Sequence, residues 1–443
     1  MIRDLIIIGA GPGGYELALA ASKRGLSTLL IEEKSVGGTC LHHGCIPTKT
    51  YYHSAKLLRD LKSFNDFGIY GDFEFSFSKA KEKKNEVVQN LYNGINFQLK
   101  NQKVQIIYGR AKLISKNEVM VNDEVHNANY IVIATGSTSI NLNLPGFDNK
   151  NVLTSTELLD INEVPKNLVV IGGGVIGIEL ASIFNYFGSK VEVIEAMDRI
   201  LPLIDKEVAK RLAAYLKNLG IKINTSSSVV GIEENKVYYN SKGQISFAPY
   251  DKVLVAVGRR ANVNDLGLAE VGIIYSKKGI DVDNNYKTNI DNIYAIGDVT
   301  GKLMLAHTAT YSGYKVLSDI LGEKKEIDFN LVPNCIFTFP EVASIGITED
   351  EAKGVDYKVN KFLFKANGKA HTIGDSDGFV KIISYNNKIL GVHILGPSAS
   401  DIIHEAAILM NSNLSIEEAK KIIFAHPTLS EALGGCILEI EKE

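Results

Sequence analysis

Cys40 and Cys45, in the segment "VGGTCLHHGCIPTKTYY", are the residues whose type and spacing most directly indicate chemistry. The other two cysteines, Cys335 and Cys436, lie far away in the chain. Four cysteines in 443 residues are too few for a structural disulfide framework, so a close pair points to a redox or a metal function. A disulfide needs Cα atoms within about 7 Å of each other. A distorted first helical turn could provide that distance, and the helix dipole there would favour a thiolate.

A metal site is the weaker alternative for this segment. Zinc sites usually have cysteines two residues apart and a second pair of ligands, and the side chains of the adjacent His42 and His43 diverge. We therefore expect a redox disulfide and no metal. Pro47 suits an early helical turn, whereas Lys49, judged by itself, is most simply a surface residue.

A duplicated glycine-rich pattern indicates a second kind of chemistry. "DLIIIGAGPGG" near the start and "NLVVIGGGVIG" from residue 167 are both short apolar strands that lead into G-x-G-x-x-G spacing and a helix-like stretch. A second strand then ends in an acid, Glu32 or Glu195, and each acid follows the first glycine of its motif by 23 residues (9 to 32 and 172 to 195). The glycines are Gly9, Gly11, Gly14, Gly172, Gly174 and Gly177.

This pattern is typical of the dinucleotide-binding βαβ unit. The glycines permit a tight turn and let a pyrophosphate approach the helix N-terminus, and the acid accepts hydrogen bonds from a ribose. One such motif alone is a weak signal, because helix packing can also produce it. Two copies with matching acids predict that the chain binds two dinucleotides.

Three further apolar strands end in small or acidic residues. "YIVIATG" ends at Thr135 and Gly136, "KVLVAVG" at Gly258 and "NIYAIGD" at Asp298. Taken alone, these are buried strands that meet turns, but their place after the glycine motifs favours a role at the cofactors. A helix is predicted to begin near Ala306. From about residue 326 the pattern predicts an antiparallel sheet with helices, an α+β domain.

Length and composition limit the remaining functions. A chain of 443 residues predicts about three domains. The net charge is −3 and the basic residues are scattered, so we expect no nucleic-acid partner. No apolar run reaches the roughly 18 residues of a membrane span, and the N-terminal segment lacks the basic region and cleavage site of a signal peptide. We therefore expect a cytoplasmic protein without a membrane partner.

The segment "GGTCLHHGCIPTK" resembles the redox-disulfide signature of the class I pyridine nucleotide-disulfide oxidoreductases. The resemblance extends over essentially the whole chain, to "AHPTLSEAL", where His426 and Glu431 match the family's catalytic His–Glu pair. It implies an α/β fold with two Rossmann-like domains, for FAD and NAD, and a C-terminal α+β dimerisation domain. The implied boundaries are 1–145 with 281–325 for FAD, 146–280 for NAD and 326–443 for a homodimer interface.

The resemblance also implies roles for individual residues. Cys45 would be the thiol nearest the flavin and Cys40 the one that exchanges with substrate, while His426, oriented by Glu431, would take the substrate proton. Lys49 would lie beside the flavin ring. The residues implied to bind FAD are Gly9, Gly11, Gly14, Glu32, Lys49, Thr135, Gly136, Asp298 (at the ribityl chain), Leu305, Ala306 and His307. Those implied to bind NAD are Gly172, Gly174, Gly177, Glu179 (also a partner for Lys49), Glu195 and Gly258.

Within the family, "ILGPSASDIIHEAAILM" looks most like the dihydrolipoyl dehydrogenase branch. That branch implies oxidation of a dihydrolipoyl group on another protein, either a 2-oxoacid dehydrogenase acyltransferase or the glycine-cleavage carrier, with NAD⁺ as acceptor. Glu195 would repel the 2′-phosphate of NADP, and Cys436 alone does not match the C-terminal cysteine pair of mercuric reductases. The alternatives are another FAD-dependent NAD(P)H disulfide reductase and a non-enzymatic flavoprotein scaffold.

Three residues depart from the family's usual pattern. Phe424 stands where a histidine often precedes "AHPTLSE", Phe339 stands at the histidine of "THPE", and Ala261 replaces the proline of "GRRPN". The first is expected to alter hydrogen bonding or polarity around the active site. None of the three removes a catalytic group.

Overall fold

The computed structural model describes residues 2–324 and 326–441. The chain forms two compact units. Unit 1 comprises Met1–Thr50, Lys81–Ile140 and Gly258–Ile327, and unit 2 comprises Tyr51–Ala80, Asn141–Val257 and Asp328–Glu443. The units do not separate the expected NAD-binding domain from the C-terminal domain, so the three-domain boundaries stay a prediction.

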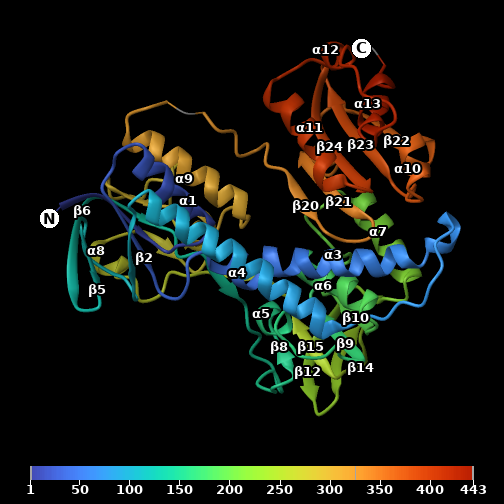
Figure 1. Ribbon diagram of the computed structural model, residues 1–443, viewed down its shortest axis with the longest axis horizontal. Helices are drawn as coiled ribbons and strands as arrows, with labels where there is room; N and C mark the ends of the chain where they lie inside the picture. Colours follow the sequence, from blue (N-terminus) through green and yellow to red (C-terminus); the bar gives the residue numbers. More distant parts are fainter. Residues whose placement is uncertain (1, 325, 442–443) are drawn as a thin grey trace. The chain divides into compact units, whose positions relative to one another are not determined.

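Unit 1 is built on a seven-stranded sheet with the order β3-β2-β1-β6-β5-β4, in which β19 also pairs with β6 (Figure 1). β1, β2, β3, β6 and β19 pair in parallel, whereas β4 and β5 are antiparallel. The inner strands are continuous apolar runs, as expected for a parallel sheet covered on both faces. The strands are β1 Ile2–Ile8, β2 Thr28–Glu32, β3 Gln105–Tyr108, β4 Lys112–Ser115, β5 Glu118–Val121, β6 Glu124–Ile133 and β19 Ile293–Ala295.

Helices α1 (Pro12–Lys23) and α9 (Ala306–Ile320) pack against each other in unit 1 (Figure 1). Glycines allow this close approach, because a Cβ on Gly13 would lie 3.0 Å from the carbonyl oxygen of Ala309, and one on Gly313 would lie 3.2 Å from that of Gly13. The predicted helix start near Ala306 is confirmed. Both helices follow parallel strands, so their first turns lie at the carboxyl edge of the sheet, where such sheets bind ligands.

Shorter elements complete unit 1. β7 pairs antiparallel with β16, and β17 with β18. Their bounds, with those of the short helices, are β7 Ser137–Ser139, β16 Arg259–Ala261, β17 Tyr275–Ser276, β18 Gly279–Ile280, α2 Gly38–His43, α8 Leu268–Val271 and η2 Gly297–Thr300.

Unit 2 contains a second parallel sheet, with the order β11-β10-β9-β15-β8, and a three-stranded antiparallel sheet, β12-β13-β14. Helix α6 follows β9 as α1 follows β1, so the sequence duplication is a structural one. The elements are β8 Val152–Leu153, α5 Ser155–Leu158, β9 Asn167–Ile171, α6 Val175–Tyr186, β10 Lys190–Ile194, α7 Lys206–Asn218, β11 Lys222–Asn224, β12 Ser227–Glu233, β13 Lys236–Ser241, β14 Gln244–Pro249 and β15 Lys252–Val255.

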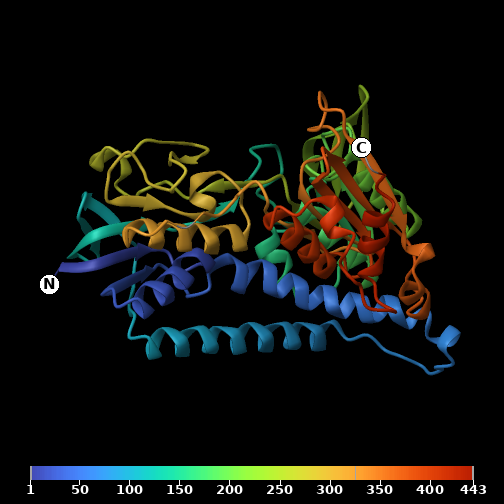
Figure 2. The ribbon, with the colours of Figure 1, turned by 90° about the horizontal axis from the view of Figure 1, so that it is seen from above.

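The C-terminal part of unit 2 is an antiparallel sheet with the order β20-β21-β24-β23-β22. Helices α11 and α13 cover one face through a shared apolar cluster, and Figure 2 shows these red helices against the orange-to-red strands. Residues on the other face, such as Phe379 and Leu395, join the core of the preceding parallel sheet. The elements are β20 Asn334–Ile336, β21 Glu341–Gly346, β22 Lys358–Leu363, η3 Phe364–Ala366, α10 Gly368–Thr372, β23 Phe379–Tyr385, β24 Lys388–Gly396, α11 Ala399–Asn411, α12 Ile416–Ala419 and α13 Glu431–Leu438.

Three helical elements remain: α3 Cys45–Leu61, η1 Phe64–Phe67 and α4 Phe77–Asn101. Across residues 2–324 and 326–441, no helix is both long enough and apolar enough to span a membrane. The two parallel sheets and the C-terminal antiparallel sheet confirm the predicted fold class, an α/β chain with two Rossmann-like parts and an α+β part.

Candidate active site

The two glycine-rich turns have closely similar geometry. Gly9 and Gly172 have φ values of +102° and +107°, and a Cβ on either would lie 2.4 Å from the carbonyl oxygen of the residue that follows the neighbouring strand. A Cβ on Gly14 or Gly177 would lie 1.9 or 2.1 Å from the carbonyl oxygen of the first glycine of the same motif. These positions therefore exclude any side chain.

Gly11 and Gly174, the middle glycines, are different. They are the N-cap residues of α1 and α6, and a Cβ on either would meet nothing within 4 Å. The N-terminal turn of each helix is therefore open beside its middle glycine, which fits the approach of a pyrophosphate.

The two acids repeat the same hydrogen bonds. Glu32 Oε2 accepts a bond from the Ala10 N–H at 2.7 Å, and its Oε1 accepts one from Lys34 N–H at 2.8 Å. Glu195 accepts corresponding bonds from Gly173 N–H at 2.5 Å and Met197 N–H at 2.6 Å. Each carboxylate is therefore held at the glycine turn, at the place where the βαβ unit binds a ribose.

The cysteine pair lies at a break between two helices. Cys40 is in the short helix α2, Cys45 is the first residue of α3, and Gly44 interrupts the helical path between them. Pro47 falls in the first turn of α3, as expected. The two sulfurs lie close enough for a hydrogen bond between them.

The pKa of Cys40 is set by the sulfur of Cys45 and by burial. A hydrogen bond with Cys45, together with burial, raises the pKa of Cys40 well above its ordinary value, and the charge of Lys49 opposes this shift only in part. The raised pKa keeps Cys40 a neutral thiol beside Cys45.

Arg259 lies near this pair, although no sequence motif predicts a role for it. Its guanidinium donates to Ser137 Oγ at 2.8 Å and to the Ser137 carbonyl at 2.7 Å, and Ser137 Oγ donates to Asp298 Oδ2 at 2.5 Å. Burial lowers the pKa of Arg259, while the negative charges of Asp298 and Cys45 oppose that shift. The signal that could have found Arg259 is its place directly after Gly258, where the third strand of the motif ends.

The other expected FAD residues lie on the same unit. Asn262 holds the turn after β6, because it donates to the Thr135 carbonyl at 2.9 Å and to the Gly136 carbonyl at 3.0 Å. Leu305 is the N-cap of α9, and Ala306 and His307 form its first turn. Thr308 in that turn is buried, and its Oγ1 has no hydrogen-bond partner in the described part of the chain. The unpartnered hydroxyl and the open helix end fit a polar cofactor.

His426 and Glu431 form a hydrogen-bonded pair in the C-terminal part of unit 2. His426 Nδ1 lies 3.0 Å from Glu431 Oε1, and Glu431 Oε2 accepts a bond from Thr428 N–H at 2.8 Å. Both hydrogen bonds lower the pKa of Glu431, and the bond from Thr428 has the larger effect. The His426 side chain is 77% exposed, so Nε2 is open to a substrate from outside the chain.

The departures from the family pattern have local explanations. Phe339 stacks on Tyr52, with ring centroids 4.6 Å apart, and lies under the Arg59 guanidinium at 5.3 Å. Phe424 packs against the backbone of Gly434 in α13, because a Cβ there would lie 2.6 Å from its ring. An apolar contact therefore occupies the position at which the family pattern often has a histidine. Ala261 is buried in β16 opposite Ser137.

Glu179 is buried in α6, and its Oε1 accepts a hydrogen bond from Phe337 N–H at 2.9 Å. Its expected ion pair with Lys49 stays a prediction. Gly258 has a φ of +121°, which favours glycine.

Comparison with known proteins decides the family. The family model of the pyridine nucleotide-disulphide oxidoreductases matches residues 3–313, and the model of that family's dimerisation domain matches residues 332–435. The chain belongs to this family. FAD and NAD(H) are the cofactors that it uses, and the dimerisation domain supports the expected homodimer.

Several relatives are similar over nearly the whole chain. A dihydrolipoyl dehydrogenase of Chlamydia muridarum is 41% identical, covering 97% of this chain and 94% of the relative. One from Bacillus subtilis is 38% identical, covering 98% of each. The solved structure of the HOCl-induced flavoprotein disulfide reductase RclA from Escherichia coli, as its Cu(II) complex, has a TM-score of 0.89 and 32% identity, covering 99% of this chain and 100% of RclA.

Proposed function

We propose that this chain is a dihydrolipoyl dehydrogenase, which oxidises a protein-bound dihydrolipoyl group and passes the electrons to NAD⁺. The observation that carries the proposal is the hydrogen-bonded His426–Glu431 pair, in which the His426 side chain is 77% exposed. When Nδ1–H donates to the Glu431 carboxylate, the lone pair on Nε2 is available to take a proton from a thiol. The similarity to curated dihydrolipoyl dehydrogenases over nearly the full chain supports the proposal.

The dithiol is oxidised by exchange with the Cys40–Cys45 disulfide. His426 takes the proton of the first substrate thiol, and the resulting thiolate attacks Cys40 Sγ. A substrate–Cys40 disulfide forms, the Cys40–Cys45 bond breaks, and Cys45 leaves as a thiolate. The second substrate sulfur then closes the lipoyl disulfide, and its proton goes to the departing Cys40. One proton is now on His426, one is on Cys40, and the electron pair is on the two cysteines.

The glycine turns and their acids are the residues that would hold the cofactors. In unit 1 the turn at Gly9, Glu32, the residues around Thr135 and Asp298, and the first turn of α9 would hold FAD. In unit 2 the turn at Gly172 with Glu195 would hold NAD⁺. Bound FAD and NAD⁺ supply the electron-accepting and hydride-transferring chemistry that returns the cysteines to a disulfide. Arg259 would stabilise negative charge on Cys45.

A homodimer would supply each active site from two chains. His426 and Glu431 lie within the segment that matches the family's dimerisation domain, whereas the cysteines lie in the other family segment. The exposed His426 ring would serve the disulfide of the partner chain. The lipoyl group would be on a separate carrier protein, an acyltransferase or the glycine-cleavage carrier, and we place the enzyme in the cytoplasm.

The assay that tests the proposal uses the purified, FAD-loaded protein with two substrate pairs. Dihydrolipoamide with NAD⁺ should form NADH, whereas glutathione disulfide with NADPH should react slowly. Similarity to the flavoprotein disulfide reductase RclA makes another disulfide reductase the second candidate. Turnover of the second pair only would establish that candidate. No reaction with either pair would support a scaffold.

Glu195 should make the enzyme prefer NAD⁺ to NADP⁺. Its carboxylate is held at the second glycine turn, where it would bind the ribose hydroxyls and repel a 2′-phosphate. Because a hydrogen bond to a charged group contributes about 1.5–3 kcal/mol, we expect Glu195→Ala to raise the KM for NAD⁺ roughly ten- to hundredfold. The ratio of kcat/KM values for NAD⁺ and NADP⁺ measures the preference. Equal use of both by the unmodified protein would overturn this assignment.

A further inference from the structure

Lys381, in the middle of β23, is a fully buried lysine in the C-terminal sheet. It lies beside His393 of β24, its cross-strand partner, on the face opposite α11 and α13. Lysine is almost never fully buried unless it is paired. The role of Lys381 therefore depends on the groups with which it pairs.

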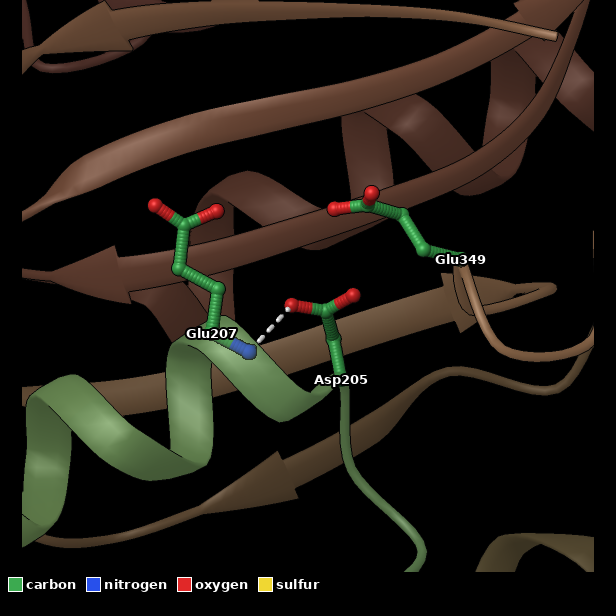
Figure 3. Close-up of side chains that lie close together, drawn as sticks. All are labelled: Asp205, Glu207 and Glu349. Atoms are coloured by element: carbon green, nitrogen blue, oxygen red, sulfur yellow. Dashed lines mark hydrogen bonds between the residues drawn. The ribbon is translucent and has the colours of Figure 1, made fainter.

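Three carboxylates surround the Lys381 ammonium. Nζ lies 2.9 and 3.0 Å from the two oxygens of Asp205 and 3.4 Å from Glu207, and it also forms an ion pair with Glu349. Figure 3 shows these carboxylates close together, with Asp205 accepting a hydrogen bond from the Glu207 N–H. They are the one group of acids, histidines or cysteines close enough to hold a metal ion in residues 2–324 and 326–441. The ammonium supplies the positive charge there.

The charges of this network are fixed by their surroundings. Burial alone would raise the pKa of Asp205, but the hydrogen bond with Lys381 brings it below its ordinary value. Burial lowers the pKa of His393, whose Nε2 lies 3.0 Å from the Ile347 carbonyl. Asp205 is therefore ionised beside a neutral histidine, and Lys381 is its balancing charge.

Asp205 has a second role, at the start of α7. It is the N-cap of this helix, because Oδ1 accepts bonds from the N–H groups of Glu207 at 3.1 Å and Val208 at 3.3 Å. Lys381 thus holds the first turn of α7 and the end of the preceding loop, residues 196–205, against the C-terminal sheet.

The same loop directly follows Glu195 and packs on the second glycine turn. Leu201 N–H donates to the Gly173 carbonyl at 2.8 Å, while Glu195 accepts from the Gly173 N–H. Arg199, within the loop, donates to the Pro202 carbonyl at 3.0 Å. One end of the loop is therefore at the proposed ribose site, and the other end is at Lys381.

We infer that Lys381 is a positioning residue for NAD⁺: through Asp205 it holds the loop of residues 196–205 in the conformation that keeps Glu195 and the Gly173 turn ready for the adenosine ribose. The inference rests on the proposed assignment of Glu195. Because Lys381 is fully buried, it would act through the loop, so its effect should appear in NAD⁺ affinity and not in oxidation of the dithiol.

Three variants test this role. Lys381→Met removes the charge at the centre of the network. Asp205→Asn weakens the ion pair but keeps a good N-cap for α7, so it gives an answer even if Lys381→Met does not fold. Lys361→Met is the matched control, because Lys361 pairs with Glu207 at 2.7 Å and has no ion pair with Asp205. For each FAD-loaded variant, the NAD⁺ dissociation constant, the flavin content, the melting temperature and the anaerobic reduction of the flavin by dihydrolipoamide are measured.

Lys381→Met and Asp205→Asn should weaken NAD⁺ binding roughly two- to thirtyfold, the range expected for indirect coupling. Reduction by dihydrolipoamide should stay within about twofold of the unmodified enzyme, and Lys361→Met should match that enzyme throughout. Variants that are merely less stable, with lower melting temperatures and unchanged NAD⁺ affinity, would overturn the inference.

Measurement of Glu195→Ala beside these variants separates this inference from the proposed function. Unchanged NAD⁺ affinity in Glu195→Ala would remove the assigned ribose site, and the positioning role with it. Failure of the unmodified enzyme to react with dihydrolipoamide would instead contradict the proposed substrate, while the effect of Lys381 on NAD⁺ affinity would still be measurable.

Discussion

Replacing His426 with glutamine should lower kcat for dihydrolipoamide oxidation about 10²–10⁴-fold, the usual contribution of a general base. Glutamine can keep a hydrogen bond to Glu431 but has no nitrogen lone pair that accepts the thiol proton. FAD content and NADH-dependent reduction of ferricyanide should be unchanged, because that reaction does not use the dithiol. Steady-state kinetics with both acceptors measures the difference.

His371→Gln is the matched control for this result. His371 lies in α10 of the same C-terminal part, and its Nε2 lies 2.7 Å from the Lys365 carbonyl. This variant should keep the activity of the unmodified enzyme. Dihydrolipoamide oxidation that survives in His426→Gln would remove His426 from the mechanism.

The two cysteine variants should differ in colour. Cys40→Ser leaves Cys45 alone, and we expect its thiolate against oxidised flavin to give a long-wavelength charge-transfer absorbance without any reductant. Cys45→Ser should show none, because it lacks the sulfur that is assigned to the flavin side of the pair. Both should lose nearly all dithiol oxidation, about 10³-fold or more, since disulfide exchange needs both sulfurs.

An absorbance spectrum of each FAD-loaded variant is sufficient for this test. Cys436→Ser is the control, because Cys436 is buried in the C-terminal core, and its spectrum should match that of the unmodified protein. A charge-transfer band in Cys45→Ser and none in Cys40→Ser would reverse the two assigned roles.

Local patterns predicted much of the fold. The glycine spacing and the two acids are local signals, and the structure gives Glu32 and Glu195 matching hydrogen bonds to their own glycine turns. The start of α9 followed from the composition around Ala306. The pairing of His426 with Glu431 also lies within one short segment, so the resemblance could point to it directly.

Contacts between distant segments could not be predicted in this way. Arg259 reaches Asp298 through Ser137, and these residues come from the separate elements β16, η2 and β7, which share no motif. In the sequence, Lys381 is indistinguishable from an ordinary lysine of a strand. Only the packing of α7 on the C-terminal sheet brings Asp205 to it. Tertiary packing also explains Phe339. Its ring stacks on Tyr52 at the position where the family pattern has a histidine.

The central claim is that His426 of one chain serves the Cys40–Cys45 pair of another. Heterodimers of a Cys40→Ser chain and a His426→Gln chain, purified with two different tags, test it most directly. A two-fold dimer contains two equivalent sites, so one site of the heterodimer would receive both intact halves and the other would receive both lesions. We expect the heterodimer to have about half the dihydrolipoamide:NAD⁺ activity of the unmodified dimer, and each parent homodimer to be nearly inactive. Heterodimers as inactive as their parents would show that each site lies within one chain and would contradict the account.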